Sequence, residues 1–328
     1  MMKKILIVFT GGTFSMVIDE ATGGAVPKFS GEELIRRIPY AKELADIECY
    51  DFGMYPGPHM TPQLMFDLSN KIKEFLAKDN FDGVIVTHGT DTLEETAYLL
   101  DLTLGTKIPV VVIGSMKNAS DPDWDGPRNL IDAISICLND NCKNLGVLVC
   151  LNGEINAASE VTKTFTDEID TFHSLDFGSL GFVDKNRVIL NRLPRKLETL
   201  NAKNIVTNVD LLTTYAGMND KFFRFSTDTC VDGLVVEALG VGNVPPEAFK
   251  GIKYAVDKNI PVLLVSRCPA GETLDIYSYP GAGKWLSSIG VIFTDYLNGQ
   301  KARIKMMLAL GITRDHIELK KIFESLEG

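Results

Sequence analysis

The stretch ILIVFTGGTFSM, residues 5–16, indicates how the first part of this chain folds. Five consecutive apolar residues (5–9) end at Thr10-Gly11-Gly12-Thr13, a pattern typical of a buried strand in a parallel sheet. Open α/β sheets bind ligands where such strands end, and glycine lets backbone approach a ligand closely. Two interpretations stay open: an ordinary strand-to-loop turn, or a site with a threonine hydroxyl as nucleophile.

A second strand and polar segment stands at residues 81–98, FDGVIVTHGTDTLEETAY. The strand 84–86 is followed by the polar run 87–92 and then by a helical pattern. Asp91 or Thr92 is expected as its N-cap, and acids in the first turn suit the helix dipole. Capping needs only one or two of these polar residues, so the run indicates chemistry as well.

A third segment, NGEINAASEVTKTFTDEIDTF at 152–172, carries Lys163 between two threonines. It reads as neither a clean helix nor a clean strand. The three segments together supply a hydroxyl, a carboxylate and an amine, which is a candidate nucleophile and acid/base set without His or Cys. A desolvated lysine can act as a base, and a neighbouring aspartate can orient it.

Six landmarks recur along the chain: TGGT at 10–13, HGTDTLEETAY at 88–98, DGPRNL at 125–130, EVTKT at 160–164, GVGN at 240–243 and LNGQKARIKMMLAL at 297–310. In these motifs, and in their order, the chain resembles the bacterial-type L-asparaginases, and within them the cytoplasmic type I enzymes. Glutaminase-asparaginases and amidotransferase subunits are relatives of that family.

The resemblance implies a role for each of four residues. Thr13 is expected to be the nucleophile that attacks the side-chain amide carbon. Thr90 is expected to position a water or stabilise the oxyanion. Lys163 is expected to act as a base through Thr90, with Asp91 orienting Lys163 and holding the substrate α-ammonium group.

The resemblance also implies substrate contacts beyond these four residues. Ser115 lies in GSM (114–116), where the family places a backbone carbonyl near the substrate amide. Asn243 is expected to reach the site of a neighbouring subunit, since the family builds each site across a dimer interface. The expected state is therefore a homodimer or homotetramer acting on a small amino-acid amide, without a cofactor or metal.

The loop expected to hold the substrate α-carboxylate departs from the family pattern. It reads MYPGPHMTP (54–62), with Gly57 and Pro58 where the family usually has a serine and a second polar residue. Pro58 has no N–H and Gly57 has no hydroxyl. The carboxylate must then be held by the backbone amide of Gly57 or His59, by the His59 ring, or less well.

The lid after the first strand is the second departure from the family pattern. Many members carry a tyrosine there that supports the nucleophile. Residues 14–39 contain no tyrosine, and the nearest is Tyr40. The lid is therefore expected to be built differently, or to borrow an aromatic residue from elsewhere.

Strand and helix patterns alternate along the chain, which predicts two α/β domains with parallel sheets flanked by helices. The larger N-terminal domain is expected to be flavodoxin-like and the smaller C-terminal one Rossmann-like. Strands are expected near 5–9, 84–86, 110–113, 147–151, 234–236, 262–265 and 290–293, and helices near 31–46, 61–78, 93–101, 127–138, 246–256 and 299–309. The expected boundaries are 1–195 for the catalytic domain, 196–210 for the linker and 211–328 for the second domain.

Bulk composition excludes several classes of protein. The 328 residues have a mean hydropathy of +0.07, typical of a globular protein, and their net charge of −10 and pI near 5.0 argue against non-specific nucleic-acid binding. The apolar run after Met-Met-Lys-Lys is shorter than a signal peptide needs, and no stretch is long enough to span a membrane. A cytoplasmic location is expected.

The six cysteines form no CxxC, and Cys137 and Cys150 are expected to be free core thiols.

Competing interpretations concern single residues as well as the whole chain. His88 is expected to position its neighbours rather than act as a base. Asp121, Asp123 and Asp125 alternate as in a calcium loop but lack its Gly and Glu, so a metal site is rejected.

The alternatives to an asparaginase are an ammonia-supplying amidotransferase subunit and a non-catalytic amino-acid-binding protein. The amidotransferase relatives carry an extra N-terminal domain, whereas here the first strand begins at residue 5.

Overall fold

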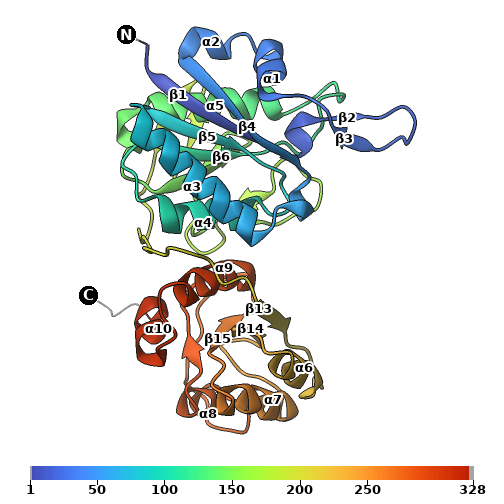
Figure 1. Cartoon of the computed structure of the whole chain (residues 1–328), viewed down its shortest axis with the longest axis vertical. Helices are drawn as coiled ribbons and strands as arrows, with labels where there is room; N and C mark the ends of the chain where they lie inside the picture. Colours follow the sequence, from blue (N-terminus) through green and yellow to red (C-terminus); the bar gives the residue numbers. More distant parts are fainter. Residues whose placement is uncertain (1, 325–328) are drawn as a thin grey trace. The chain divides into compact units, whose positions relative to one another are not determined.

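The computed structural model describes residues 2–324, and the chain divides after Thr199 into two compact units (Figure 1). Each unit is a β-sheet covered by helices, which confirms the predicted α/β class with a larger N-terminal and a smaller C-terminal part. Within residues 2–324, every helix is too short or too polar to cross a lipid bilayer.

An eight-stranded sheet forms the centre of the N-terminal unit, in the order β12-β11-β8-β7-β6-β5-β1-β4. The strands from β7 to β4 are parallel, whereas β8, β11 and β12 each run antiparallel to their neighbour. The sheet is therefore mixed rather than wholly parallel. The strands are Lys4–Gly11 (β1), Asp46–Tyr55 (β4), Gly83–Thr87 (β5), Val110–Ile113 (β6), Val147–Leu151 (β7), Glu154–Ala157 (β8), Gly181–Asp184 (β11) and Arg187–Leu190 (β12).

Helices cover both faces of this sheet, because alternate residues of each buried strand point to opposite sides. Ile5 and Ile7 pack toward α1 (Gly31–Arg37), α2 (Ala41–Leu44) and α5 (Gly126–Leu138). Leu6 and Val8 pack toward α3 (Pro62–Lys78) and α4 (Leu93–Leu104). Figure 1 shows α3 and α4 together on one side of the sheet.

Two short two-stranded ribbons extend from this sheet. The hairpin of β2 (Met16–Ile18) and β3 (Ala25–Pro27) projects away from the sheet directly after the TGGT loop (Figure 1). The ribbon of β9 (Thr162–Lys163) and β10 (Phe172–His173) carries Lys163. Cross-strand pairing therefore holds the backbone around Lys163 in place. Each of these strands is only two residues long, which is too short to produce an alternating pattern in the sequence.

The structure differs from the expected elements in several places, since short strands such as β2, β3, β8, β11 and β12 were not expected, and two further differences have a clear physical reason. The helix expected over 31–46 is divided into α1 and α2, because Pro39 cannot continue a helix and disfavours helical backbone at Ile38. The edge strand β4 was not expected. Its residues are mostly half-buried or exposed, so it lacks the continuous apolar run of a central strand.

The C-terminal unit is built on a four-stranded parallel sheet in the order β13-β14-β15-β16. Its strands are Val209–Thr213 (β13), Gly233–Ala238 (β14), Val262–Ser266 (β15) and Ile292–Phe293 (β16). One face packs against α6 (Lys221–Asp228), α7 (Pro246–Asp257) and α8 (Gly283–Ser288). Of the helices α9 (Gly299–Leu310) and α10 (His316–Phe323), α9 contacts β14 closely, since a Cβ on Gly233 would lie 3.1 Å from Leu310.

All six cysteines are free thiols, and Cys137, Cys142 and Cys150 are buried in the N-terminal unit. This confirms the expectation for Cys137 and Cys150. Burial raises the pKa of Cys142 to about 11 and the pKa of Cys137 further still, so both thiols stay protonated at neutral pH.

Candidate active site

Three loops from distant parts of the sequence meet backbone to backbone beyond the carboxyl ends of β1, β4 and β5. A Cβ added to Gly12 would lie 2.4 Å from the Cα of Gly89, and one added to Gly89 would lie 2.7 Å from the Cα of Gly57. Such distances exclude a side chain at either position. Gly12 also has a φ of +70°, which favours glycine. These glycines therefore bring Thr13, the loop 57–59 and Thr90 to one junction.

Lys163 lies beside two of its expected partners at this junction. Its Nζ is 3.0 Å from Thr90 Oγ1 and 3.1 Å from Asp91 Oδ1. The Lys163 side chain is 15% exposed and that of Asp91 is 59% exposed. The amine is thus largely withdrawn from water while the carboxylate faces solvent, an arrangement in which Asp91 can both orient the amine and meet a cationic ligand.

The two threonines of TGGT differ in their surroundings. Thr10 is buried, and its hydroxyl donates a hydrogen bond to the Thr87 carbonyl at 2.8 Å. Thr13 is half-buried at the start of the short 3-10 helix η1 (Thr13–Ser15), and its hydroxyl bonds to no side chain or carbonyl of residues 2–324. Thr13 is therefore the one with a free hydroxyl for a reaction, and Thr10 joins two strands.

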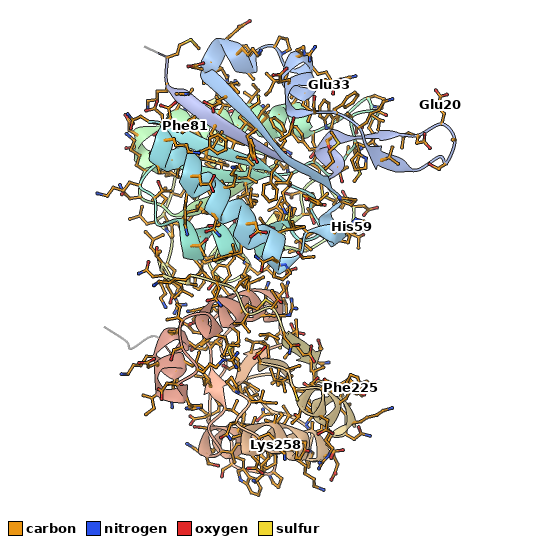
Figure 2. The ribbon with its side chains drawn as sticks, viewed as in Figure 1. Glu20, Glu33, His59, Phe81, Phe225 and Lys258 are labelled. Atoms are coloured by element: carbon orange, nitrogen blue, oxygen red, sulfur yellow. The ribbon has the colours of Figure 1, made fainter. Side chains whose placement is uncertain are left out.

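The loop expected to hold a carboxylate forms a second 3-10 helix, η2 (Gly57–His59). The His59 amide donates to the Pro56 carbonyl at 2.9 Å, so it is already used within the turn. Of the alternatives from the sequence, the Gly57 amide and the His59 ring remain. Pro58 and His59 are exposed, and Figure 2 shows the His59 side chain at the surface of the N-terminal unit.

Thr92 joins this loop to the segment that carries Thr90. It occupies the N-cap position of α4, as one of the two expected candidates, but its side chain makes no capping hydrogen bond. Its hydroxyl instead donates to the Gly57 carbonyl at 2.7 Å. The polar run 87–92 thus uses this hydroxyl to hold two loops together.

His88 is completely buried behind the junction. Burial lowers the pKa of its imidazole to about 4, so the ring is neutral at physiological pH. Its Nδ1 lies 2.8 Å from the Gly89 carbonyl and its Nε2 lies 2.8 Å from Thr96 Oγ1. With both nitrogens engaged and no exposed surface, His88 has the geometry of a positioning residue.

Ser115 contacts the junction of Thr13, Thr90 and Lys163 only indirectly. It has no exposed surface, and its hydroxyl lies 2.6 Å from Asp125 Oδ1 and close to the Lys117 carbonyl, two acceptors that share its proton. Its neighbour Gly114 makes the direct contact, since a Cβ there would lie 3.0 Å from Thr90 Cγ2. The sequence reasoning missed Asp125 in this environment, although its motif DGPRNL is one of the six landmarks.

Asn243 belongs to the C-terminal unit, in the segment that follows β14. It closes a β-bridge with Leu239, and its Oδ1 is buried without a hydrogen-bond partner among the described residues. A buried amide oxygen without a donor carries a desolvation cost.

No tyrosine lies in the hairpin after Thr13, and Tyr40 does not replace it. Tyr40 precedes α2 and β4, so it lies near the amino end of the parallel strands, whereas TGGT follows the carboxyl end of β1. The tyrosine next to the TGGT loop is Tyr55, whose carbonyl accepts a hydrogen bond from the Gly12 amide at 2.9 Å. Sequence reasoning missed it because β4 was not expected.

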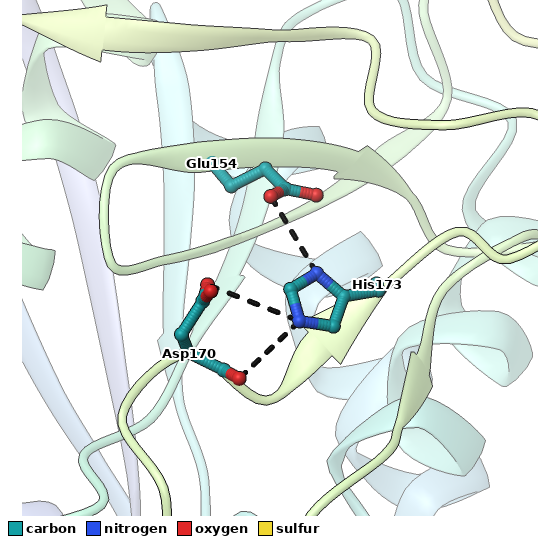
Figure 3. A group of neighbouring side chains, drawn as sticks. All are labelled: Glu154, Asp170 and His173. Carbon is teal, nitrogen blue, oxygen red and sulfur yellow. Dashed lines mark hydrogen bonds and ion pairs between the residues drawn. The ribbon is translucent and has the colours of Figure 1, made fainter.

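A second polar cluster lies next to the Lys163 ribbon, and Figure 3 shows its three residues. His173 Nδ1 lies 3.6 Å from the Glu154 carboxylate, whereas Nε2 lies 3.2 Å from the Asp170 backbone carbonyl and 3.9 Å from the Asp170 carboxylate. The two carboxylates therefore face different ring nitrogens. The three residues offer one ligand atom each within 4.8 Å of one another, and the contact of Nε2 with the Asp170 carbonyl fixes the ring within its own ribbon.

Comparison with known proteins identifies the class. The family model described as "Asparaginase, N-terminal" matches residues 4–196, and the model described as "Glutaminase/Asparaginase C-terminal domain" matches residues 208–323. The chain belongs to the asparaginase family.

Individual relatives agree with this assignment. A probable L-asparaginase of Deinococcus radiodurans is 34% identical over 98% of this chain and 97% of its own. The crystal structure of a probable cytoplasmic L-asparaginase from Campylobacter jejuni matches with a TM-score of 0.88 at 31% identity, covering 98% of this chain and 99% of that one. A glutamyl-tRNA(Gln) amidotransferase subunit of Methanobrevibacter smithii is 29% identical over 98% of this chain but 75% of its own.

Proposed function

We propose that this protein hydrolyses the side-chain amide of L-asparagine to L-aspartate and ammonia, with some activity on L-glutamine. The observation that carries the proposal is the contact of Lys163 with Thr90 and Asp91, next to the glycine junction from which Thr13 emerges. A hydroxyl, an amine and a carboxylate meet there.

In the proposed reaction, the Thr13 hydroxyl oxygen attacks the amide carbon and its proton passes to the leaving nitrogen. The C–N bond breaks, ammonia leaves, and an ester joins Thr13 to the substrate. A water positioned by Thr90 then attacks the ester carbon. Lys163 accepts the proton of this water through the Thr90 hydroxyl, and the return of that proton to the Thr13 oxygen as the ester breaks restores the enzyme.

Substrate binding is proposed to use the exposed Asp91 carboxylate for the α-ammonium group. The loop of Gly57, Pro58 and His59 would face the α-carboxylate, with the Gly57 amide and the His59 ring as its donors. Ser115 is proposed to offer its backbone carbonyl to the substrate amide, which requires the junction to open around it, since Ser115 is buried here.

The assembly is proposed to be a cytoplasmic homodimer or homotetramer, with Asn243 completing the site of a neighbouring subunit. The C-terminal unit supports this with a group of large apolar side chains that stay 40–55% exposed: Leu274, Ile276, Tyr277, Tyr279 and Trp285. Leu274 also connects these side chains to the loop that carries Asn243, because its backbone amide donates a hydrogen bond to the Val241 carbonyl at 2.7 Å. Exposed apolar groups of this kind mark association surfaces.

An ammonia-release assay with L- and D-asparagine and L- and D-glutamine tests the function. The expected result is turnover of L-asparagine above all others. Ammonia release only with a partner enzyme present would favour the amidotransferase alternative, to which the 29% identical relative points. Binding of an amino acid without turnover would favour the non-catalytic alternative, which the presence of Thr13, Thr90, Asp91 and Lys163 argues against.

A further inference from the structure

Asp125 occupies the N-cap position of α5, yet its carboxylate makes no capping hydrogen bond to that helix. It instead accepts four hydrogen bonds. Ser115 Oγ at 2.6 Å and the Lys117 amide at 2.9 Å donate to Oδ1. The Met116 amide at 3.0 Å and Asn129 Nδ2 at 3.1 Å donate to Oδ2. Three of the four donors belong to the loop that follows β6, so this carboxylate holds that loop.

The loop held by Asp125 packs against Thr90. A Cβ added to Gly114 would lie 3.0 Å from Thr90 Cγ2 and 3.0 Å from the His88 carbonyl, so the backbone there is in contact with both. Asn129 Nδ2 also donates to the Gly114 carbonyl at 3.0 Å. The loop therefore covers the methyl group of Thr90, while the Thr90 hydroxyl lies 3.0 Å from Lys163 Nζ.

We propose that Asp125 is a positioning residue for the Thr90 hydroxyl and that it acts through the loop 114–117. A threonine side chain has three staggered χ1 positions, and only one of them points Oγ1 at Lys163. Close packing of Gly114 on the methyl group disfavours the other two. Loss of the Asp125 carboxylate frees the loop and with it the rotation of Thr90. The proposal rests on the proposed function only in assigning the Thr90–Lys163 pair to amide hydrolysis.

The chemistry of the four bonds requires a carboxylate at position 125. All four partners are donors, and only an ionised carboxylate offers acceptors at both oxygens. In Asp125→Asn one oxygen becomes an NH₂ group that faces N–H or O–H donors and leaves them unpaired. The N-terminus of α5 adds a favourable dipole for the negative charge.

An alternative route from this segment leads to the nucleophile rather than to Thr90. Trp124, the residue before Asp125, packs edge-on against Phe14, with ring centroids 5.6 Å apart. Phe14 follows Thr13 directly. A test of the proposal must therefore distinguish an effect through Thr90 from one through Thr13.

The test measures kcat and KM for L-asparagine in Asp125→Asn. Misplacement of a catalytic group by a distant change costs up to roughly 100-fold, so kcat is expected to fall about 10- to 100-fold with a much smaller change in KM. Asp123→Asn is the matched control, since Asp123 in the same stretch makes an exposed ion pair with Lys117. It is expected to leave both constants unchanged.

A double-mutant cycle decides the route. In a Thr90→Val background, Asp125→Asn is expected to add little further loss, because the hydroxyl that it positions is gone. An equal fall in kcat in both backgrounds, or an unchanged kcat in the single variant, overturns the proposal. If Asp125→Asn does not fold, Ser115→Ala, which removes one of the four donors, is measured in the same cycle with a smaller expected effect.

Amide hydrogen exchange gives a readout that does not depend on activity. Asp125→Asn is expected to speed exchange in peptides covering 84–93 and 113–118, and Asp123→Asn is not. Unchanged exchange at 84–93 contradicts the proposal even if the loop itself loosens. A wild-type chain that releases no ammonia refutes the proposed function, whereas the exchange experiment still decides whether Asp125 positions the Thr90 segment.

Discussion

The Thr96 hydroxyl donates a hydrogen bond to His88 Nε2 across 2.8 Å inside the N-terminal unit. The direction of this bond follows from the other ring nitrogen. Nδ1 lies 2.8 Å from the Gly89 carbonyl, which can only accept, so in the neutral ring Nδ1 carries the proton and Nε2 accepts. The imidazole thereby fixes the orientation of the peptide between Gly89 and Thr90, directly behind the candidate active site.

Acid is expected to destabilise the protein through His88. Its pKa is about 4 in the folded chain against 6.5 for the ordinary side chain, so between these values only the unfolded chain binds the proton. The free energy of unfolding therefore falls as the pH drops from 6.5 to 4, by about 3 kcal/mol at the end of this window. Urea unfolding across this range measures it, and His88→Asn, which cannot titrate, should show a flatter dependence. An equal slope in both proteins contradicts the assignment.

Thr13→Ala is expected to remove nearly all turnover without loss of fold, because Thr13 is half-buried and its hydroxyl has no partner among the described residues. Thr10→Val is the matched control. It removes the bond to the Thr87 carbonyl and is expected to lower the melting temperature more than kcat. If Thr13→Ala keeps more than about a tenth of wild-type kcat, the activation barrier has risen by less than about 1.4 kcal/mol, and Thr13 is not the nucleophile.

Lys163→Met is expected to lower kcat by about 10²–10⁴, the usual cost of a lost general base. The amine has two partners, Thr90 and Asp91, so a purely structural role is the competing explanation. That role predicts a lower melting temperature with normal kcat. Lys250→Met, at an exposed ion pair with Glu247 on α7 of the C-terminal unit, serves as the control and should leave kcat unchanged.

Gly57→Ser is expected to strengthen substrate binding. Gly57 does not have a positive φ, so the backbone accepts a serine. Its Cβ would lie 3.3 Å from the Asp91 Cβ, which requires a shift of a few tenths of an ångström. A hydroxyl bonded to a carboxylate is worth about 1.5–3 kcal/mol, so KM should fall roughly ten- to a hundredfold.

Two further variants interpret the Gly57→Ser result. Gly57→Ala adds the same Cβ without the hydroxyl, and a similar fall in its KM would exclude the hydroxyl as the cause. His59→Ala tests the ring as the present holder of the carboxylate. A marked rise in KM with little change in kcat supports that role, whereas an unchanged KM leaves the Gly57 amide as the holder.

If each active site contains residues of two subunits, two variants that are inactive alone should regain activity when they form a mixed dimer. Lys163→Met and Asn243→Ala are each expected to be poorly active alone. When they are co-expressed, mixed dimers contain one site with both native residues, so part of the wild-type activity should return. Sedimentation that shows an active 36.1 kDa monomer at assay concentration refutes the oligomer, and absence of recovery argues against Asn243 in a neighbour's site.

The fold class and most central elements could be predicted from the amino-acid pattern. The apolar runs at 5–9, 84–86, 110–113 and 147–151 all became strands of the large sheet, because a strand covered by helices on both faces must be apolar throughout. The polar residues after those strands marked the candidate site, since the carboxyl ends of parallel strands share one edge of a sheet.

The assembly of the site, in contrast, depends on tertiary contacts. Lys163 reaches Thr90 through a two-residue strand pair, and β4 is an edge strand with half-exposed residues, so neither has a period that the sequence could reveal. The role of Asp125 depends on four donors that lie 4 to 10 residues away along the chain. Hydrogen bonds between residues that are not adjacent in the chain leave no pattern in composition or hydrophobicity. Only the tertiary structure therefore decided that the Asp125 carboxylate binds the loop that packs against Thr90.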